Sequence, residues 1–214
     1  MAERTDKDLD LRERQELCDL MLELGPDAPT LCEGWSTADL AAHLAIRERD
    51  PRSGPGIMLG GRFARYTAKL QAREKTRPYV SVVDRVRRPP RGPLSIPPLR
   101  RGMSFLEYVV HHEDVRRANT RPARIDRPDL QSAVWKMVTR LLPFVVRRAH
   151  TQRRIVIETP AGASKAAGKG ATVTIKGEPV ELLLFLQGRR MAANVELVGA
   201  PDDVDAVRGG RFGL

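Results

Sequence analysis

Apolar side chains recur at helical spacing through the first 150 residues of the chain. In LCDLMLEL, residues 17–24, they stand at positions i, i+3, i+4 and i+7, which gives a helix one apolar face. The same kind of pattern predicts four main helices over residues 8–24, 35–50, 104–119 and 128–149, and two weaker ones over 62–75 and 79–88. Four amphipathic helices joined by long connections are typical of a helix bundle.

The segment from 51 to 101 interrupts this pattern. It opens with PRSGPGIMLGG, which has the composition of a loop, and closes with RRPPRGPLSIPPLRR, which contains five prolines. Because proline lacks a backbone N–H and obstructs the helix interior, residues 87–101 are predicted to be irregular. We expect residues 51–101 to serve as a long crossing connection or a lid.

The periodicity changes after Arg153. RIVIET and TVTIK alternate apolar and polar side chains as half-buried strands do, and NVELVG predicts a third strand. AGASKAAGKG predicts a flexible hairpin turn, and PVELLLFLQGRR a short helix. The predicted fold class is therefore mainly α, with a four-helix bundle over residues 1–150 and a small α/β region over residues 151–214.

Charge and composition narrow the functional classes. The 214 residues carry a formal net charge of +10, which attracts nucleic acid when it is gathered on one face. The arginines recur as scattered pairs, so nucleic-acid binding is the less favoured interpretation. No apolar leader opens the chain and no run of about 18 apolar residues follows, so we expect a cytoplasmic protein that does not enter membranes. Cys18 and Cys32 are then expected to be reduced and structural.

The segment EYVVHHED, residues 107–114, contains two of the four histidines. Residues four apart on a helix differ by about 40° around its axis, so Glu107, His111 and Asp114 share one face. His112 points about 100° away from His111. The adjacent histidines therefore cannot bind one ion together.

A further inward side chain comes from the helix over residues 35–50, where His43 shares a face with two leucines. A glutamate and two histidines from facing helices are the protein ligands of an open divalent-metal site, which leaves a position for water or substrate. His43, Glu107 and His111 are the predicted ligands, with zinc as the metal and nickel as the alternative. Two structural alternatives stay open, because Ser104 and Glu107 have capping-box spacing and His43 can be a core histidine bonded to a carbonyl.

Three more side chains are candidates for the same site. Asp114, one turn beyond His111, can hold that ring by a hydrogen bond or can pair with Arg117 on the surface. Arg47 and His112 are candidates for binding a substrate or thiol. A guanidinium group can form two parallel hydrogen bonds with a carboxylate, and an imidazole can transfer a proton. The alternative for His112 is a solvated surface histidine.

Two motifs give the chain a family resemblance. LCEGWSTADLAAHL resembles the W-x-x-x-D-L-x-x-H-L segment of the DinB-like metal-binding family, and EYVVHHEDV resembles its E-V-x-V-H-x-x-D-L segment. Within that family the chain resembles the N-terminal domain of the mycothiol-dependent maleylpyruvate isomerases, and most of all a branch of small metal-binding proteins in which GPDAPTLCEGW, HLAIRER and VHHEDVRRA recur. The resemblance extends to the C-terminal GEPVELLLFLQGR, whereas residues 51–101 have no counterpart and the region after 150 is shorter.

The resemblance implies an up-and-down bundle whose metal is bound by His43, Glu107 and His111. The characterised members of the family use mycothiol or a related low-molecular-weight thiol. We expect a divalent-metal-binding transferase or isomerase that acts on a small-molecule thiol or carboxylate-bearing substrate, as a monomer or homodimer. A metal-bound thiol loses its proton near neutral pH and becomes the nucleophile. The alternatives are a non-catalytic bundle that binds or senses metal or thiol and, less favoured, a basic protein associated with nucleic acid.

Overall fold

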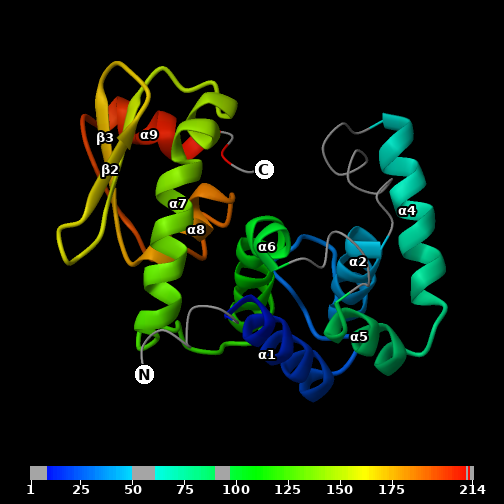
Figure 1. Cartoon of the computed structure of the whole chain (residues 1–214). Coiled ribbons are helices and arrows are strands. Elements are labelled where there is room, and N and C mark those ends of the chain that lie inside the picture. Colours follow the sequence, from blue (N-terminus) through cyan, green and yellow to red (C-terminus); the bar gives the residue numbers. More distant parts are fainter. Residues whose placement is uncertain (1–8, 50–60, 90–96, 211, 213–214) are drawn as a thin grey trace. The chain divides into compact units, whose positions relative to one another are not determined.

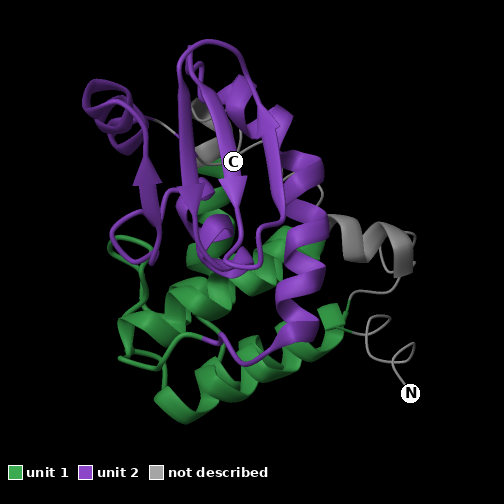
Figure 2. Ribbon diagram, turned by 90° about the vertical axis from the view of Figure 1, so that its left-hand side faces the viewer, with its two compact units in different colours: residues 1–123 green, residues 124–214 purple. Residues whose placement is uncertain are grey.

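The computed structural model describes residues 9–49, 61–89, 97–210 and 212, with residues 61–64 and 97–103 described by their backbone alone. The described residues form eight helices and one four-stranded sheet (Figure 1). They divide into two compact units, unit 1 over residues 1–123 and unit 2 over residues 124–214 (Figure 2). The predicted class, mainly α with a small C-terminal α/β region, is confirmed.

Unit 1 is a helix bundle made of α1 (Leu9–Leu24), α2 (Thr37–Arg49), α4 (Gly61–Lys75), α5 (Tyr79–Arg87) and α6 (Pro97–Ala118). Its core cluster takes buried side chains from α1, α2, α5 and α6. α5 packs on both α1 and α2, and α1 packs along α6. The fourth helix of this core is thus the short α5 and not the helix over 128–149, because Val82, Val83 and Val86 give α5 a fully buried face.

α6 is longer than its sequence pattern predicts. The pattern places its start near residue 104, but the helix begins at Pro97, so the end of the proline-rich segment 87–101 is helical. Pro97 and Pro98 lie in the first turn, where the backbone N–H that proline lacks has no partner within the helix. Ser104 therefore lies inside α6, and the alternative in which Ser104 and Glu107 cap its start is wrong. Residues 51–60 and 90–96 of the predicted connection lie outside the described residues.

The start of α2 is fixed by Ser36 and Asp39, which stand three positions apart, the spacing of a capping box. The Ser36 N–H donates to Asp39 Oδ2 at 3.1 Å, and the Asp39 N–H points back to Ser36 Oγ at 3.5 Å. Burial raises the pKa of Asp39, but hydrogen bonds from Lys75 and Ser36 outweigh it and lower the pKa overall. These hydrogen bonds to the Asp39 carboxylate fix the residue at which α2 begins. They thereby fix the direction in which His43 points two turns later.

Unit 2 contains α7 (Pro128–Arg148), β1 (Arg154–Glu158), β2 (Ser164–Ala167), β3 (Thr172–Lys176), α8 (Pro179–Leu186), β4 (Glu196–Val198) and α9 (Pro201–Gly209). The strand order is β2-β1-β3-β4, and β1 runs antiparallel to β2 but parallel to β3, with Ile155 opposite Val173. The segment AGASKAAGKG, predicted as a hairpin turn, therefore contains strand β2. Because β2 folds back on β1 first, β1 and β3 do not form the predicted hairpin.

α7 belongs to unit 2, so the chain passes from unit 1 to unit 2 after residue 123, whereas the sequence placed the boundary after residue 150. Leu130, Val134, Val138 and Leu142 are buried at a spacing of four along α7, which packs on α8 and β2. α8 is buried along its whole length, as its apolar sequence PVELLLFL requires. The apolar face of α7 is thus covered within unit 2.

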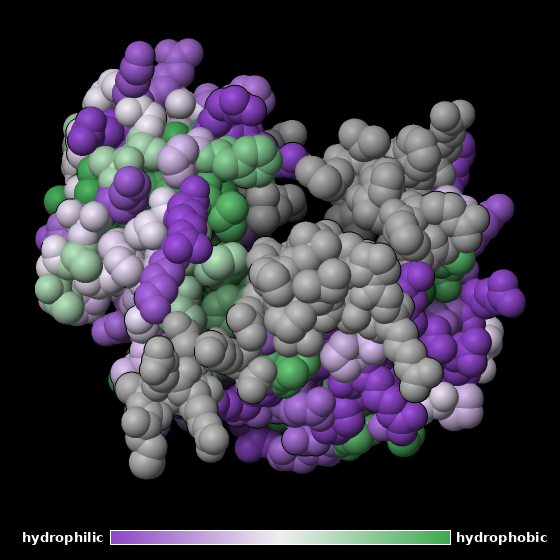
Figure 3. All heavy atoms as spheres, viewed as in Figure 1, coloured by the Kyte–Doolittle hydropathy of each residue, from purple (hydrophilic) through white to green (hydrophobic). Residues whose placement is uncertain are grey.

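The outward-facing side chains are mostly polar. On the face drawn in Figure 3, hydrophilic residues predominate and apolar ones show between them. Large exposed apolar side chains are spread along the sequence, among them Leu22, Ile125 and Met191. None of the described helices combines the length and the hydropathy that crossing a bilayer requires.

Candidate metal centre

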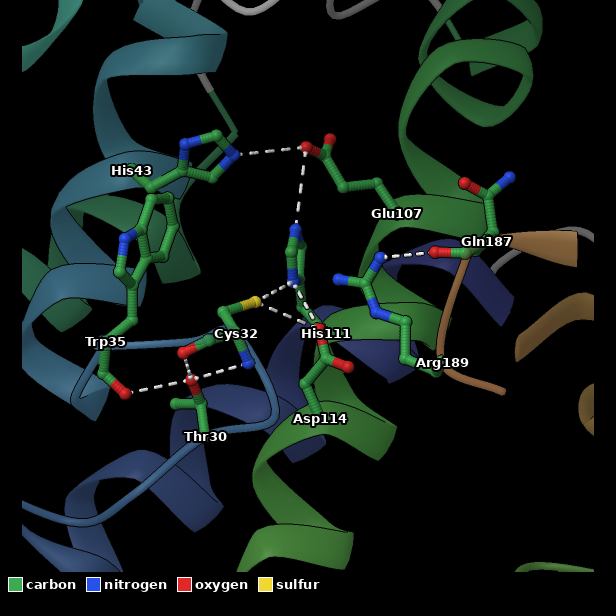
Figure 4. Close-up of polar contacts among 9 residues, drawn as sticks. All are labelled: Thr30, Cys32, Trp35, His43, Glu107, His111, Asp114, Gln187 and Arg189. Carbon is green, nitrogen blue, oxygen red and sulfur yellow. Dashed lines mark hydrogen bonds and ion pairs between the residues drawn. The ribbon is translucent and has the colours of Figure 1, made fainter. Parts of the chain in front are cut away.

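His43 of α2 and Glu107 and His111 of α6 point at one another within unit 1 (Figure 4). The Glu107 Oε1 atom lies 3.6 Å from His43 Nε2 and 3.9 Å from His111 Nε2. The two imidazole rings stand edge to face, with their centroids 5.6 Å apart. The structure therefore brings together the three side chains that the sequence predicts as metal ligands.

This donor set fits a divalent ion. Nitrogen and oxygen ligands placed about 2.0–2.1 Å from a tetrahedral zinc ion lie about 3.3–3.4 Å from one another. The two separations from Glu107 Oε1, 3.6 and 3.9 Å, are slightly longer than this edge, so small side-chain rotations bring the donors into range. The three side chains are 10–13% exposed, and a tetrahedral ion held by three protein ligands keeps one coordination position for water or a small molecule.

His43 is held as a neutral imidazole. Burial, together with the nearby His111 and the Arg47 guanidinium, lowers the pKa of His43 to about 3. The ring also packs against the indole of Trp35, with the centroids 5.1 Å apart. A metal-binding histidine must be deprotonated, and at neutral pH no proton competes with a cation for this ring.

Asp114 holds His111 from the side away from Glu107. Its Oδ2 accepts a hydrogen bond from His111 Nδ1 at 2.9 Å, and its side chain is fully buried. Because a carboxylate only accepts, Nδ1 carries the proton, and in the neutral ring Nε2 keeps the lone pair that faces Glu107. Burial lowers the pKa of His111, but the contacts with Asp114 and Cys32 outweigh burial and raise it. Arg117, the surface partner considered for Asp114, forms an ion pair with Glu113.

Cys32, which the sequence suggested was structural, lies beside this pair. Its thiol donates to Asp114 Oδ2 at 3.3 Å and lies 3.9 Å from His111 Nδ1. The loop before α2 is fixed by Thr30 Oγ1, which accepts the Cys32 N–H at 3.2 Å, and by the Leu31 N–H, which donates to the Asp114 carbonyl at 3.1 Å. Local sequence gives no signal for this contact, because Cys32 and Asp114 are 82 positions apart.

Arg47 lies one turn beyond His43 on α2 and forms an ion pair with Glu107 Oε2. The two oxygens of Glu107 thus face different partners, Oε1 the histidines and Oε2 the guanidinium. The Arg47 side chain is 28% exposed, more than any of the three predicted ligands. The structure therefore places this predicted binding residue at the rim of the candidate centre.

His112 faces in a different direction, as its position next to His111 requires. It is 3% exposed, and its Nδ1 lies 3.2 Å from Glu13 Oε2 of α1. The interpretation of His112 as a solvated surface histidine is wrong, because α1 packs over this side of α6. Its contact with Glu13 places it between these two helices, away from the face that carries Glu107 and His111.

The comparisons with known proteins bear on the fold. No model of a known protein family matches the chain, and a search of curated proteins finds no match either. Among solved structures, the crystal structure of the mycothiol-dependent maleylpyruvate isomerase is similar, with a TM-score of 0.60 and 13% sequence identity. The match covers 92% of this chain and 93% of that chain. At this identity the likeness shows that the chain shares the fold of that isomerase over nearly its whole length.

Proposed function

We propose that this protein binds a divalent metal, zinc first of all, through His43, Glu107 and His111, and catalyses a thiol-dependent transfer or isomerisation of a small molecule. The observation that carries the proposal is the convergence of two imidazole nitrogens on one carboxylate oxygen, at 3.6 and 3.9 Å. The fold shared with the mycothiol-dependent maleylpyruvate isomerase supports the thiol-dependent part.

Each side chain has a role that its surroundings support. His43 is neutral and needs no deprotonation before it binds a cation. Asp114 sets the tautomer of His111, so that the ring presents Nε2 to the shared position. Arg47 fixes the second oxygen of Glu107, which favours binding of a metal through Oε1 alone. With only three protein ligands, one coordination position stays open.

The open position suits a thiol cofactor. A bound divalent ion would lower the pKa of a coordinated thiol and so supply a thiolate at neutral pH. Arg47 stands at the rim with its side chain 28% exposed, and a planar guanidinium that pairs with Glu107 through one nitrogen has further N–H groups to offer a carboxylate. A small molecule or thiol that carries a carboxylate is therefore the substrate class that we propose.

Elemental analysis of the untagged protein after zinc reconstitution and desalting tests the metal ligands. We expect one equivalent of zinc in the wild-type protein, little in His111→Ala or Glu107→Gln, and the wild-type amount in His150→Asn. His150 is a suitable control because it lies in unit 2, and asparagine tolerates its positive φ of 49°. Zinc-free wild-type protein, or equal zinc in His111→Ala and wild type, would refute the proposed centre.

A second experiment separates catalysis from simple binding. The zinc-loaded protein is incubated with mycothiol and carboxylate-bearing electrophiles, maleylpyruvate among them, while thiol binding is measured by calorimetry. Turnover that disappears in His111→Ala supports the enzyme. Zinc-dependent thiol binding without turnover of any of them would instead favour the non-catalytic bundle that binds or senses thiols.

A further inference from the structure

The two ring nitrogens of His111 face two different groups of metal-binding atoms. Nε2 faces Glu107 and His43, which form the candidate centre described above. Nδ1, on the opposite edge of the ring, faces Asp114 and the thiol of Cys32 (Figure 4). The second group contains sulfur, nitrogen and carboxylate donors, and all three side chains belong to unit 1.

The spacing of this second group is close to that of a coordinated ion. A thiolate about 2.3 Å from a tetrahedral zinc ion and nitrogen or oxygen ligands at about 2.0–2.1 Å lie about 3.3–3.6 Å from one another. The measured separations are 3.3 Å from sulfur to Asp114 Oδ2, 3.9 Å from sulfur to His111 Nδ1, and 2.9 Å from Nδ1 to Oδ2. Each measured separation differs by no more than about 0.5 Å from the edge expected for its own pair of donors, so a cation needs little rearrangement to enter.

We propose that Cys32, Asp114 and His111 Nδ1 form a second cation site, selective for thiophilic ions such as Cd²⁺. Thiolate ligands select soft ions, whereas the His43, Glu107 and His111 group has only nitrogen and oxygen donors. Cys32 is partly exposed on the loop before α2, whereas Asp114 and His111 are buried. The site does not depend on the proposed enzymatic function and stands if the first group holds no metal.

Charge and proton counts balance for a divalent ion. Binding releases the Cys32 thiol proton to solvent, and the proton on His111 Nδ1 moves to Nε2, so the ring stays neutral. The carboxylate and the new thiolate carry two negative charges, which the ion neutralises within a largely buried setting. A neutral ring has one lone pair, so an ion on Nδ1 removes Nε2 from the first site. A thiophilic ion at the second site therefore displaces a metal from the proposed centre.

The test is a titration of the full-length, phosphine-reduced protein with CdCl₂, followed by the ultraviolet charge-transfer absorption of a thiolate bound to cadmium. We expect this band in the wild type, in Cys18→Ala, and in His43→Gln, which removes a ligand of the first site only. The band should vanish in Cys32→Ser. In His111→Ala and Asp114→Asn the cadmium concentration at half-saturation should rise at least tenfold. Circular dichroism of each variant confirms that it is folded.

Three results would overturn the proposal: no band in the wild type, a band that survives in Cys32→Ser, or an unchanged midpoint in both His111→Ala and Asp114→Asn. The last would mean that a single cysteine captures the ion. Measuring zinc binding by the same variants distinguishes the two proposed sites. If the wild type binds no zinc but shows the cadmium band, the proposed centre is refuted and the second site is supported. If the wild type binds zinc but shows no cadmium band, the second site is refuted and the proposed centre is supported.

Discussion

Replacing Arg14 by methionine should destabilise unit 1 strongly, because the guanidinium is buried in a network that joins four helices. Arg14 of α1 is 1% exposed, and it donates to the two carboxylate oxygens of Glu48 of α2 at 2.7 and 2.5 Å. It also donates to the Val86 carbonyl of α5 at 2.6 Å and stacks over the Tyr108 ring of α6 at 4.3 Å. The substitution leaves the carboxylate of Glu48 without this counter-charge.

The expected magnitude follows from that burial. Removing one partner of a buried ion pair costs about 3–5 kcal/mol, whereas an exposed pair contributes about 0–1 kcal/mol. The Glu48 side chain is 9% exposed, so we expect Arg14→Met to lower the free energy of unfolding by about 3–5 kcal/mol. Glu48→Met should cost about 3 kcal/mol, toward the lower end, because Arg14 keeps the Val86 carbonyl and the Tyr108 ring. The double variant should cost much less than the sum, because no buried charge is left unpaired.

The assay is urea unfolding with a chelator present, followed by tryptophan fluorescence in a Trp135→Phe background. Trp135 lies in unit 2, so the remaining Trp35 reports on unit 1, where it packs against the core cluster. A double-mutant cycle then yields the coupling energy between Arg14 and Glu48, which we expect to exceed about 2 kcal/mol. Additive single effects, or an Arg14→Met cost below about 1 kcal/mol as in exposed pairs, would refute the reasoning.

Two further predictions concern the surroundings of the candidate centre. Asp114→Asn should weaken zinc binding about 10- to 100-fold, because a neutral amide that can also donate replaces the carboxylate that sets the tautomer of His111. Competition with a chromophoric chelator measures this change, and an unchanged zinc affinity would contradict the role of Asp114. Alkylation of the native protein near pH 8, followed by mass spectrometry of peptides, should label Cys32 and spare Cys18, since burial raises the pKa of Cys18 to about 12 and keeps it protonated. That folded pKa lies above the ordinary thiol value of 9.0, so the contribution of Cys18 to stability is intact below pH 9 and is lost as the pH rises from 9 to 12. Cys18→Ala should therefore lose less stability across that range. Rapid labelling of Cys18 at pH 8 would contradict this account.

Periodicity predicted the helices of the chain and the direction of its functional side chains. A helix fixes the angle between residues of known spacing, so Glu107 and His111 had to share a face and His112 had to leave it. The Ser36 and Asp39 pair likewise fixed the start of α2 and with it the inward direction of His43. These features depend on contacts within a few residues, which is why the sequence alone was sufficient.

Tertiary packing decided which elements lie together. An apolar stripe shows that a helix face is buried but does not name its partner, so α5 and not α7 completes the core cluster, and α8 covers α7. For the same reason the sequence did not predict the contacts of His112 with Glu13 and of Cys32 with Asp114. These contacts join residues that are 99 and 82 positions apart. Such contacts form only when distant segments pack, and that packing is driven by the burial of apolar surface, for which no local pattern names the partner.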